Sequence, residues 1–140
     1  MHRVARYAWS LPNSAPGAVL AAVAVATGGR AGVVRGVLEA HGGVVSFILH
    51  RMVPLRGGAS AMTLGHVVLG RDAGCLERTR AHERVHVRQC EAWGPFFIPA
   101  YLLASVLAAV RGRHFYRDNP FEREAFARAA EAAPGDEFSL

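Results

Sequence analysis

The sequence contains no lysine, and all 16 of its basic residues are arginine. Eleven acidic residues leave a formal net charge of +5, which by itself invites an anionic partner. The arginines are scattered along the chain, however, with no dense basic run and no nucleic-acid-binding motif. Alanine, glycine and valine are also abundant, so the charge reflects overall composition as much as binding. We therefore expect no nucleic-acid partner.

Cysteine is scarce. Cys75 and Cys90 are too few for a disulfide scaffold and do not form a CxxC pair. Fifteen positions apart on one helix, they would lie about 22 Å from each other, which is too far for a disulfide bond. We expect two reduced, partly buried thiols.

Hydrophobic runs long enough to cross a membrane are also lacking. Residues 15–29 and 95–110 are apolar, but both fall short of the roughly 20 residues that span a bilayer. The first follows a basic start without an obvious cleavage site, which argues against a cleaved signal peptide. The second contains Pro99, and a buried helix is favoured over a membrane span. Peripheral membrane association stays open, and a cytoplasmic or membrane-associated location is favoured over secretion.

The size and composition indicate one domain. The chain has 140 residues, of which 51% are hydrophobic, enough for a sizeable core. We expect a basic and apolar segment over residues 1–30, irregular over 1–14, with a short helix over 16–27. The core is expected over 31–133, and residues 134–140 form a loose tail.

Strand chemistry dominates the middle of the chain. Residues 31–40, 44–53 and 60–72 are rich in β-branched and large apolar residues and are separated by glycine-containing turns. This pattern predicts about three strands in a small antiparallel meander.

Helical chemistry follows from Gly74 onward. No proline or glycine interrupts the sequence before Gly94, residues 96–110 predict an apolar helix, and Asn119-Pro120 opens a last helix that ends near Ala133. Strands followed by helices indicate an α+β fold.

The first of these helices carries the pattern HExxH. His82 and His86 are one turn apart and can present both imidazoles to one metal ion. Zinc binds neutral imidazole and can keep a position open for water. Glu83 lies next to the first histidine and can accept a proton from that water. The alternative to a metal site is that these are two surface histidines on an arginine-rich helix.

A catalytic zinc site needs a third protein ligand. Glu122 and Glu124 lie in the first turn of the last helix, on different faces, so only one is expected to reach the metal. Glu122 could instead form a capping-box pattern with Asn119. Glu124 could be a solvated charge that the helix dipole favours. His114, in the preceding loop, is a further candidate ligand.

The stretch "HERVH", followed about 35 residues later by "NPFEREA", resembles the gluzincin zinc metallopeptidases, in particular their small members with a minimal scaffold. The resemblance implies that His82, His86 and Glu122 hold the zinc ion and that Glu83 is the general base. It also implies a strand beside the cleft, which "TLGHVVLGRD" resembles. Where the family has an acidic or amide residue that supports a ligating histidine, this sequence has Phe126.

Two residues of the loop before the last helix are candidates for transition-state stabilisation. Sites of this type often use a tyrosine or histidine to hydrogen-bond the developing oxyanion. Tyr116 and His114 are placed for that role, with ordinary loop packing as the alternative.

The sequence is therefore compatible with two functions. The first is a zinc-dependent metallopeptidase that hydrolyses a peptide or protein substrate. The second is a catalytically inactive metal-binding scaffold or interaction module with a peptidase-like fold. The intact Glu83 favours the enzyme, whereas the short chain and Phe126 favour the scaffold. Neither the substrate nor the oligomeric state follows from the sequence.

Overall fold

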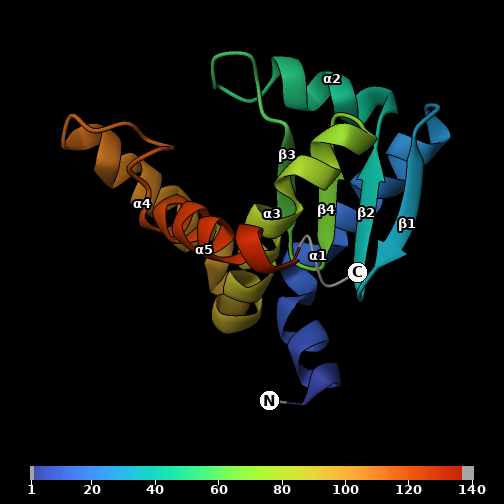
Figure 1. The fold of residues 1–140 in the computed structure, drawn as a ribbon, viewed down its shortest axis with the longest axis horizontal. Helices are drawn as coiled ribbons and strands as arrows, with labels where there is room; N and C mark the ends of the chain where they lie inside the picture. Colours follow the sequence, from blue (N-terminus) through green and yellow to red (C-terminus); the bar gives the residue numbers. More distant parts are fainter. Residues whose placement is uncertain (1, 137–140) are drawn as a thin grey trace.

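A four-stranded sheet is the centre of the fold. The computed structural model describes residues 2–136, with side chains through residue 132. The strand order is β1-β2-β4-β3 (Figure 1), with bounds Arg30–Val34, Val37–His41, Val67–Gly70 and Ala61–Leu64, respectively. A small sheet combined with helices confirms the expected α+β class.

Two of the three segments predicted as single strands each form a hairpin of two strands. Residues 31–40 form β1 and β2 around Arg35-Gly36, and both of these residues have positive φ angles, 48° and 79°. Such angles are typical of the tight turns that join antiparallel strands. Residues 60–72 form β3 and β4 around Gly65, with φ 64°.

The predicted antiparallel meander is wrong at the centre of the sheet. β2 and β4 pair in parallel, with Leu38 opposite Val67. The strand predicted over residues 44–53 is also wrong, because this segment is the helix α2 (Gly43–Arg51). Its two buried residues, Val45 and Leu49, are four apart and belong to one core cluster. Tertiary packing here outweighs the β-propensity of the segment.

The irregular start predicted over residues 1–14 is wrong as well, because α1 runs from Arg3 to Ala26. Pro12 and Pro16 lie inside it and remove helical hydrogen bonds to the carbonyl groups of Ala8 and Pro12. Ala8 and Pro12 are exposed, so water can replace the missing donors. Ser10 and Asn13, both buried, tie the helix to the carbonyl groups of Cys90 and Gly94.

The sheet separates two apolar clusters. Val67 and Leu69 of β4 face α1 and α2, in a cluster completed by Ala21, Ala24, Ala40, Val45 and Leu49. Val68, one residue from each, faces the opposite side and packs with Val37, Leu76 and Val87. This alternation is the ordinary period of a strand. Because Leu76 and Val87 belong to α3 (Ala73–Trp93), this helix lies against the face of the sheet that α1 and α2 leave free.

The helices expected after the strands are present. α3 begins behind Asp72, whose side chain accepts a hydrogen bond from the backbone N–H of Cys75 (2.7 Å). A 3₁₀ turn, η1 (Gly94–Phe96), leads into α4 (Phe97–Val110). The last helix, α5 (Pro120–Asp136), continues past the expected end at Ala133. Of the expected tail, residues 137–140 lie outside the described residues. Cys75 and Cys90 are free and buried.

The expectation of a buried helix over residues 95–110 is wrong. Only Phe97 and Ala108 of α4 are buried, and α4 extends away from the sheet (Figure 1). The continuous helical stretch Ala73–Val110 contains an 18-residue window with a mean hydropathy of 1.7, of which 17% is buried. By length and composition, this is the one segment among the described residues that could cross a membrane.

Candidate metal centre

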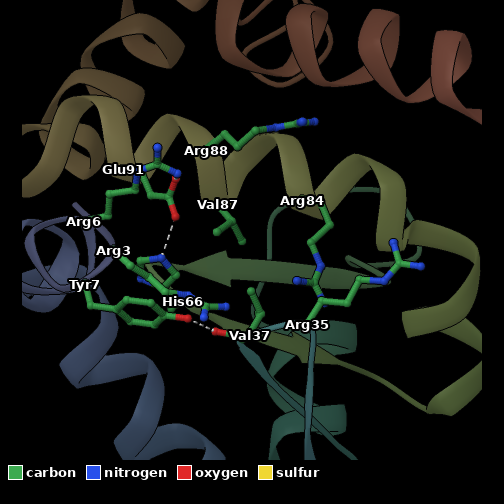
Figure 2. Close-up of a pocket in the computed structure, with 11 residues that line it drawn as sticks. Arg3, Arg6, Tyr7, Arg35, Val37, His66, Arg84, Val87, Arg88 and Glu91 are labelled. Atoms are coloured by element: carbon green, nitrogen blue, oxygen red, sulfur yellow. Dashed lines mark hydrogen bonds and ion pairs between the residues drawn. The ribbon is translucent and has the colours of Figure 1, made fainter. Parts of the chain in front are cut away.

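The helix α3 presents polar side chains on two faces. On one face, Arg84 and Arg88 line a pocket of about 290 Å³ that also receives arginines from α1 and the β1–β2 turn, namely Arg3, Arg6 and Arg35 (Figure 2). His66 lies at this pocket, buried, with its Nε2 2.8 Å from Glu91 Oε1 and its ring stacked on Tyr7. The three chemically defined residues of the HExxH motif, His82, Glu83 and His86, do not line this pocket.

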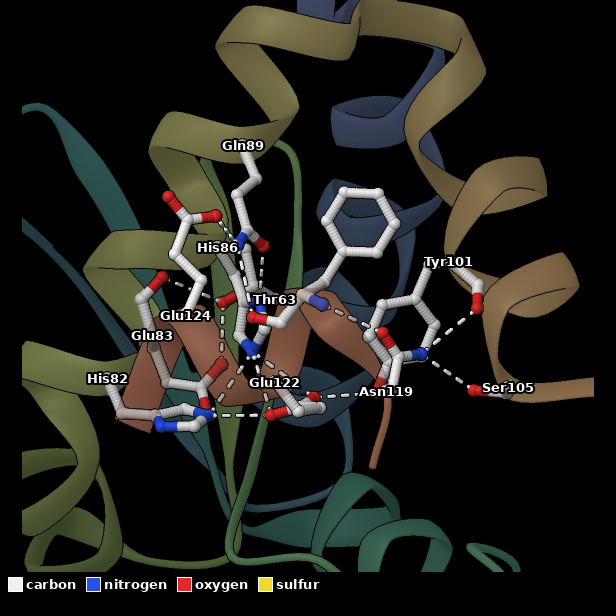
Figure 3. A network of polar contacts seen from close by, with 11 residues as sticks. Thr63, His82, Glu83, His86, Gln89, Tyr101, Ser105, Asn119, Glu122 and Glu124 are labelled. Atoms are coloured by element: carbon white, nitrogen blue, oxygen red, sulfur yellow. Dashed lines mark hydrogen bonds and ion pairs between the residues drawn. The ribbon is translucent and has the colours of Figure 1, made fainter. Parts of the chain in front are cut away.

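The other face of α3 carries His82 and His86, and α5 lies against it. His82 and His86 point toward Glu122 of α5 (Figure 3). His82 Nε2 lies 2.9 Å from Glu122 Oε2, and His86 Nε2 lies 3.2 Å from the same oxygen. The two Nε2 atoms are 3.2 Å apart. The structure therefore brings together the three residues that the sequence proposed as ligands.

This donor set has the dimensions of a zinc site. Tetrahedral zinc with bonds of about 2.0 Å places its ligand atoms about 3.3 Å apart. The three separations of 2.9, 3.2 and 3.2 Å are close to that value. Two imidazole nitrogens and one carboxylate oxygen are also donors that zinc prefers. His82, His86 and Glu122 could therefore hold a metal ion.

Gln89 determines which nitrogen of His86 faces the cluster. The Gln89 amide donates from Nε2 to the carbonyl oxygen of Phe121 (3.1 Å) and to Glu124 Oε2 (2.8 Å). Its Oε1 therefore faces His86 Nδ1, at 2.8 Å. The proton of a neutral His86 then lies on Nδ1, which leaves a lone pair on Nε2 for a metal ion.

His82 lacks a comparable partner. Its Nδ1 is buried and has no hydrogen-bond partner among the described residues. The ring of Phe126 packs against the imidazole instead, with the ring centroids 4.4 Å apart. An apolar side chain cannot accept the Nδ1 proton, so the orientation of His82 depends on packing and on its contact with Glu122.

Glu83 is a buried carboxyl group beside the cluster. Its Oε2 accepts a hydrogen bond from Thr63 Oγ1 of the edge strand β3 (2.7 Å). Burial raises the pKa of Glu83, which outweighs the opposing effects of His86 and Thr63. A carboxyl group with a raised pKa exchanges a proton more readily near neutral pH.

Glu122 is held as a carboxylate. Burial alone would raise its pKa, but hydrogen bonds with His82 and His86 and from Tyr101 lower it to about 2. The hydroxyl group of Tyr101 on α4 donates to Glu122 Oε1 (2.6 Å). The side chain thus faces the histidines, and the N-terminus of α5 is capped by Asn119, whose Oδ1 accepts from the N–H of Phe121 (2.9 Å).

Glu124 does not join the cluster. Its Oε2 accepts from Gln89, and its Oε1 lies 2.9 Å from Arg128 Nε. It is therefore neither the third ligand in this arrangement nor a purely solvated charge. Through Gln89 it acts on the imidazole of His86.

The two loop candidates are placed differently. Tyr116 is half-buried, and burial together with the nearby carboxylates of Glu122 and Glu83 raises the pKa of its phenol. Its hydroxyl group therefore stays protonated as a hydrogen-bond donor beside the cluster. His114 is exposed, and its Nδ1 accepts hydrogen bonds from the backbone N–H groups of Tyr116 and Arg117 (3.1 Å each). His114 thus orders the loop and does not join the ligand group.

Compared with known protein families, curated proteins and solved structures, the chain matches none. The features that bear on its chemistry are therefore those of the site itself, which has three donors on two helices and a buried carboxyl group beside them.

Sequence reasoning missed two residues of this site and left one undecided. No motif marks Thr63 or Tyr101, although Tyr101 is the one tyrosine of α4, a helix whose other residues apart from Ser105 are apolar. Gln89 continues the helical face of His82 and His86, and from the sequence alone this position fits a wall of the site and a core contact of the helix equally well. Its spacing of three residues from His86 is the signal that could have identified it.

Proposed function

We propose that the chain is a zinc-dependent metallopeptidase with a gluzincin-type site. The observation that carries this proposal is the convergence of His82, His86 and Glu122, with a buried carboxyl group one residue after the first histidine. A structural metal site needs ligands only. The placement of Glu83 adds a proton acceptor, which hydrolysis requires.

Each residue of the site has its own role in the proposed hydrolysis. His82, His86 and Glu122 would hold the ion, which when bound supplies Lewis acidity that polarises a carbonyl group and makes water more acidic. Glu83 accepts the proton of the attacking water and passes it to the leaving amine. The hydroxyl group of Tyr116 donates a hydrogen bond to the developing oxyanion.

The substrate under this proposal is a peptide or protein. Thr63, which donates to Glu83, belongs to β3, the edge strand of the sheet next to the site. The N–H and C=O groups on the open side of an edge strand are free to pair with another extended chain. An extended peptide lying there would have its backbone close to Glu83.

A metal-binding scaffold without activity is the second candidate. It is favoured by the contact of Phe126 with His82, whose buried Nδ1 has no partner in the described part of the chain. Loss of such support typically weakens metal binding or activity by about 10- to 100-fold. A site with one unsupported histidine could hold metal and still turn over poorly.

Cleavage of an unstructured protein such as casein distinguishes the two candidates. The zinc-loaded wild type should cleave it, and Glu83→Gln should abolish cleavage while retaining zinc. Glu77→Gln is the matched control, because Glu77 lies on the same helix but is exposed, and it should cleave as the wild type does. A zinc-loaded wild type without cleavage would leave the scaffold as the better account.

The third ligand has its own test. Glu122→Ala should lose zinc, because among the described residues Glu122 is the carboxylate that forms a metal-competent group with both histidines. Glu124→Ala removes an acceptor of Gln89 and the ion pair with Arg128 but no ligand, and it should keep zinc. The reverse pattern would assign the ligand role to Glu124.

A further inference from the structure

We propose that the outer face of α4 docks on the surface of an anionic lipid bilayer and holds the chain there as a peripheral protein. The face consists of five aliphatic side chains that are 42–78% exposed: Leu102, Leu103, Val106, Leu107 and Val110. Their spacing of three to four residues places them in one stripe along the helix. We call this set the outer stripe.

The outer stripe lies opposite the face of α4 that serves the metal centre. Tyr101 and Ser105 are four residues apart, with the buried Phe97 and Ala108 on the same side. Tyr101 donates to Glu122, and Ser105 accepts a hydrogen bond from Asn119 (2.8 Å). The face of α4 that carries Tyr101 and Ser105 is therefore occupied by contacts with the rest of the protein, whereas nothing in the described part of the chain covers the outer stripe.

Aromatic residues adjoin the N-terminal end of α4. Phe96 is 63% exposed, and its ring meets the exposed ring of Trp9 of α1, with the centroids 6.3 Å apart. Tryptophan is enriched at the level of the lipid head groups, where one end of the ring is wet and the other is apolar. The apolar surface thus continues from α4 onto α1.

The charges around the outer stripe select an anionic surface. No aspartate or glutamate occurs between Ala92 and Arg117. Arg111 and Arg113 follow the stripe directly and are exposed, and Arg117 belongs to the same loop. An apolar helix face next to basic residues is the arrangement that binds anionic membranes, where each arginine near the surface contributes attraction.

A peripheral position fits α4 better than a transmembrane one. The 14 residues of α4 alone span about 21 Å, whereas the hydrocarbon core is roughly 30 Å thick. A span within the stretch Ala73–Val110 would therefore also have to take in the end of α3 and η1, where Cys90 and Gly94 are buried against the rest of the protein. Surrounding α4 with lipid would also separate Tyr101 and Ser105 from their partners on and next to α5. A second copy of the chain is the alternative occupant, and the five aliphatic side chains alone fall short of the roughly 800 Å² that each partner of a stable complex buries.

Co-sedimentation of the full chain with vesicles tests this proposal. We expect the wild type to bind vesicles of phosphatidylcholine with about 30% phosphatidylglycerol, to bind pure phosphatidylcholine at least tenfold more weakly, and to dissociate as salt is raised. Leu103→Asp/Val106→Asp should weaken binding by at least about tenfold. Val33→Asp is the matched control, because Val33 is an aliphatic residue on β1 that is at least as exposed as Leu103 and Val106, and it should bind as the wild type does.

A second variant keeps the test independent of the stripe mutations. Arg111→Glu/Arg113→Glu alters only exposed side chains and should weaken binding to the anionic vesicles while leaving thermal unfolding unchanged. The readout is binding alone, so it does not depend on the proposed peptidase activity.

Four results would overturn the proposal. The first is that the wild type binds neither vesicle, and the second is that Val33→Asp loses as much binding as the stripe variant. The third is that the bound protein resists alkaline carbonate extraction. The fourth is a wild-type dimer that does not bind vesicles and that only the stripe mutations dissociate. The third would indicate a membrane span, and the fourth a second copy of the chain as the occupant of the outer stripe.

Discussion

Replacing Gln89 with leucine should weaken zinc binding without removing any ligand. The substitution deletes the acceptor of His86 Nδ1 (2.8 Å) and both hydrogen bonds that orient the amide. The imidazole is then free to carry its proton on either nitrogen, and one of these forms cannot bind metal through Nε2. Loss of such a partner typically lowers metal affinity by about 10- to 100-fold, or roughly 1.4–2.7 kcal/mol.

The assay is competition with a chromophoric chelator, which gives the zinc dissociation constant of each variant. Glu124→Gln is the matched control, because a glutamine at this position still offers an oxygen to Gln89 Nε2. We expect that control to stay within about threefold of the wild type. Thermal unfolding of the zinc-free proteins, measured in parallel, separates the effect on metal affinity from the effect on the fold.

Two outcomes would refute the reasoning about His86. In the first, Gln89→Leu binds zinc as tightly as the wild type. In the second, Glu124→Gln loses as much affinity as Gln89→Leu, which would point to a general loss of packing between α3 and α5 in place of control over one imidazole proton.

Three further predictions concern stability and the environment of Glu122. Asn119→Ala should lower the free energy of unfolding by about 2 kcal/mol in chemical denaturation, because it removes a helix cap and two further hydrogen bonds of a fully buried side chain; an unchanged midpoint would contradict this. Burial alone would raise the pKa of Glu39, but Arg80 and Arg84 lower it below the ordinary 4.5, so this ion pair stabilises the fold above that pH and is lost as the pH falls. Glu39→Gln should therefore destabilise the protein by about 2 kcal/mol at pH 7, because both arginines lose a charged hydrogen-bond acceptor, and it should reduce the fall in denaturation midpoint between pH 5 and pH 3. Tyr101→Phe removes a donor to Glu122 (2.6 Å) and should move the pH of half-maximal zinc release upward in an acid titration; an unchanged release curve would show that Tyr101 does not stabilise the carboxylate.

The sequence predicted those parts of the fold that depend on local patterns. α3 was predictable because no proline or glycine interrupts residues 75–93, and α5 because Asn119-Pro120 marks a helix start. α2 was not, because its β-branched residues favour a strand locally, and only packing against α1 and the sheet makes it a helix. The second half of α1 was predicted as the helix over residues 16–27, whereas its first half was missed, because prolines break a helix unless the freed carbonyl groups face water.

The candidate site divides in the same way. His82, Glu83 and His86 belong to one motif on one helix, so their arrangement follows from helical spacing. The contacts of Thr63 and Tyr101, and those of Gln89 with α5, join different elements, and no sequence pattern specifies which elements will meet. The bare outer face of α4 shows the same limit: an apolar helix predicts burial, whereas its exposure depends on which neighbours the fold provides.

The zinc content of the purified chain tests the central claim most directly. Elemental analysis of protein purified without chelator should find about one zinc ion per chain in the wild type and in Glu83→Gln, and close to none in His86→Ala. A wild type that contains no zinc, and binds none when zinc is supplied, would contradict both the peptidase and the metal-binding scaffold.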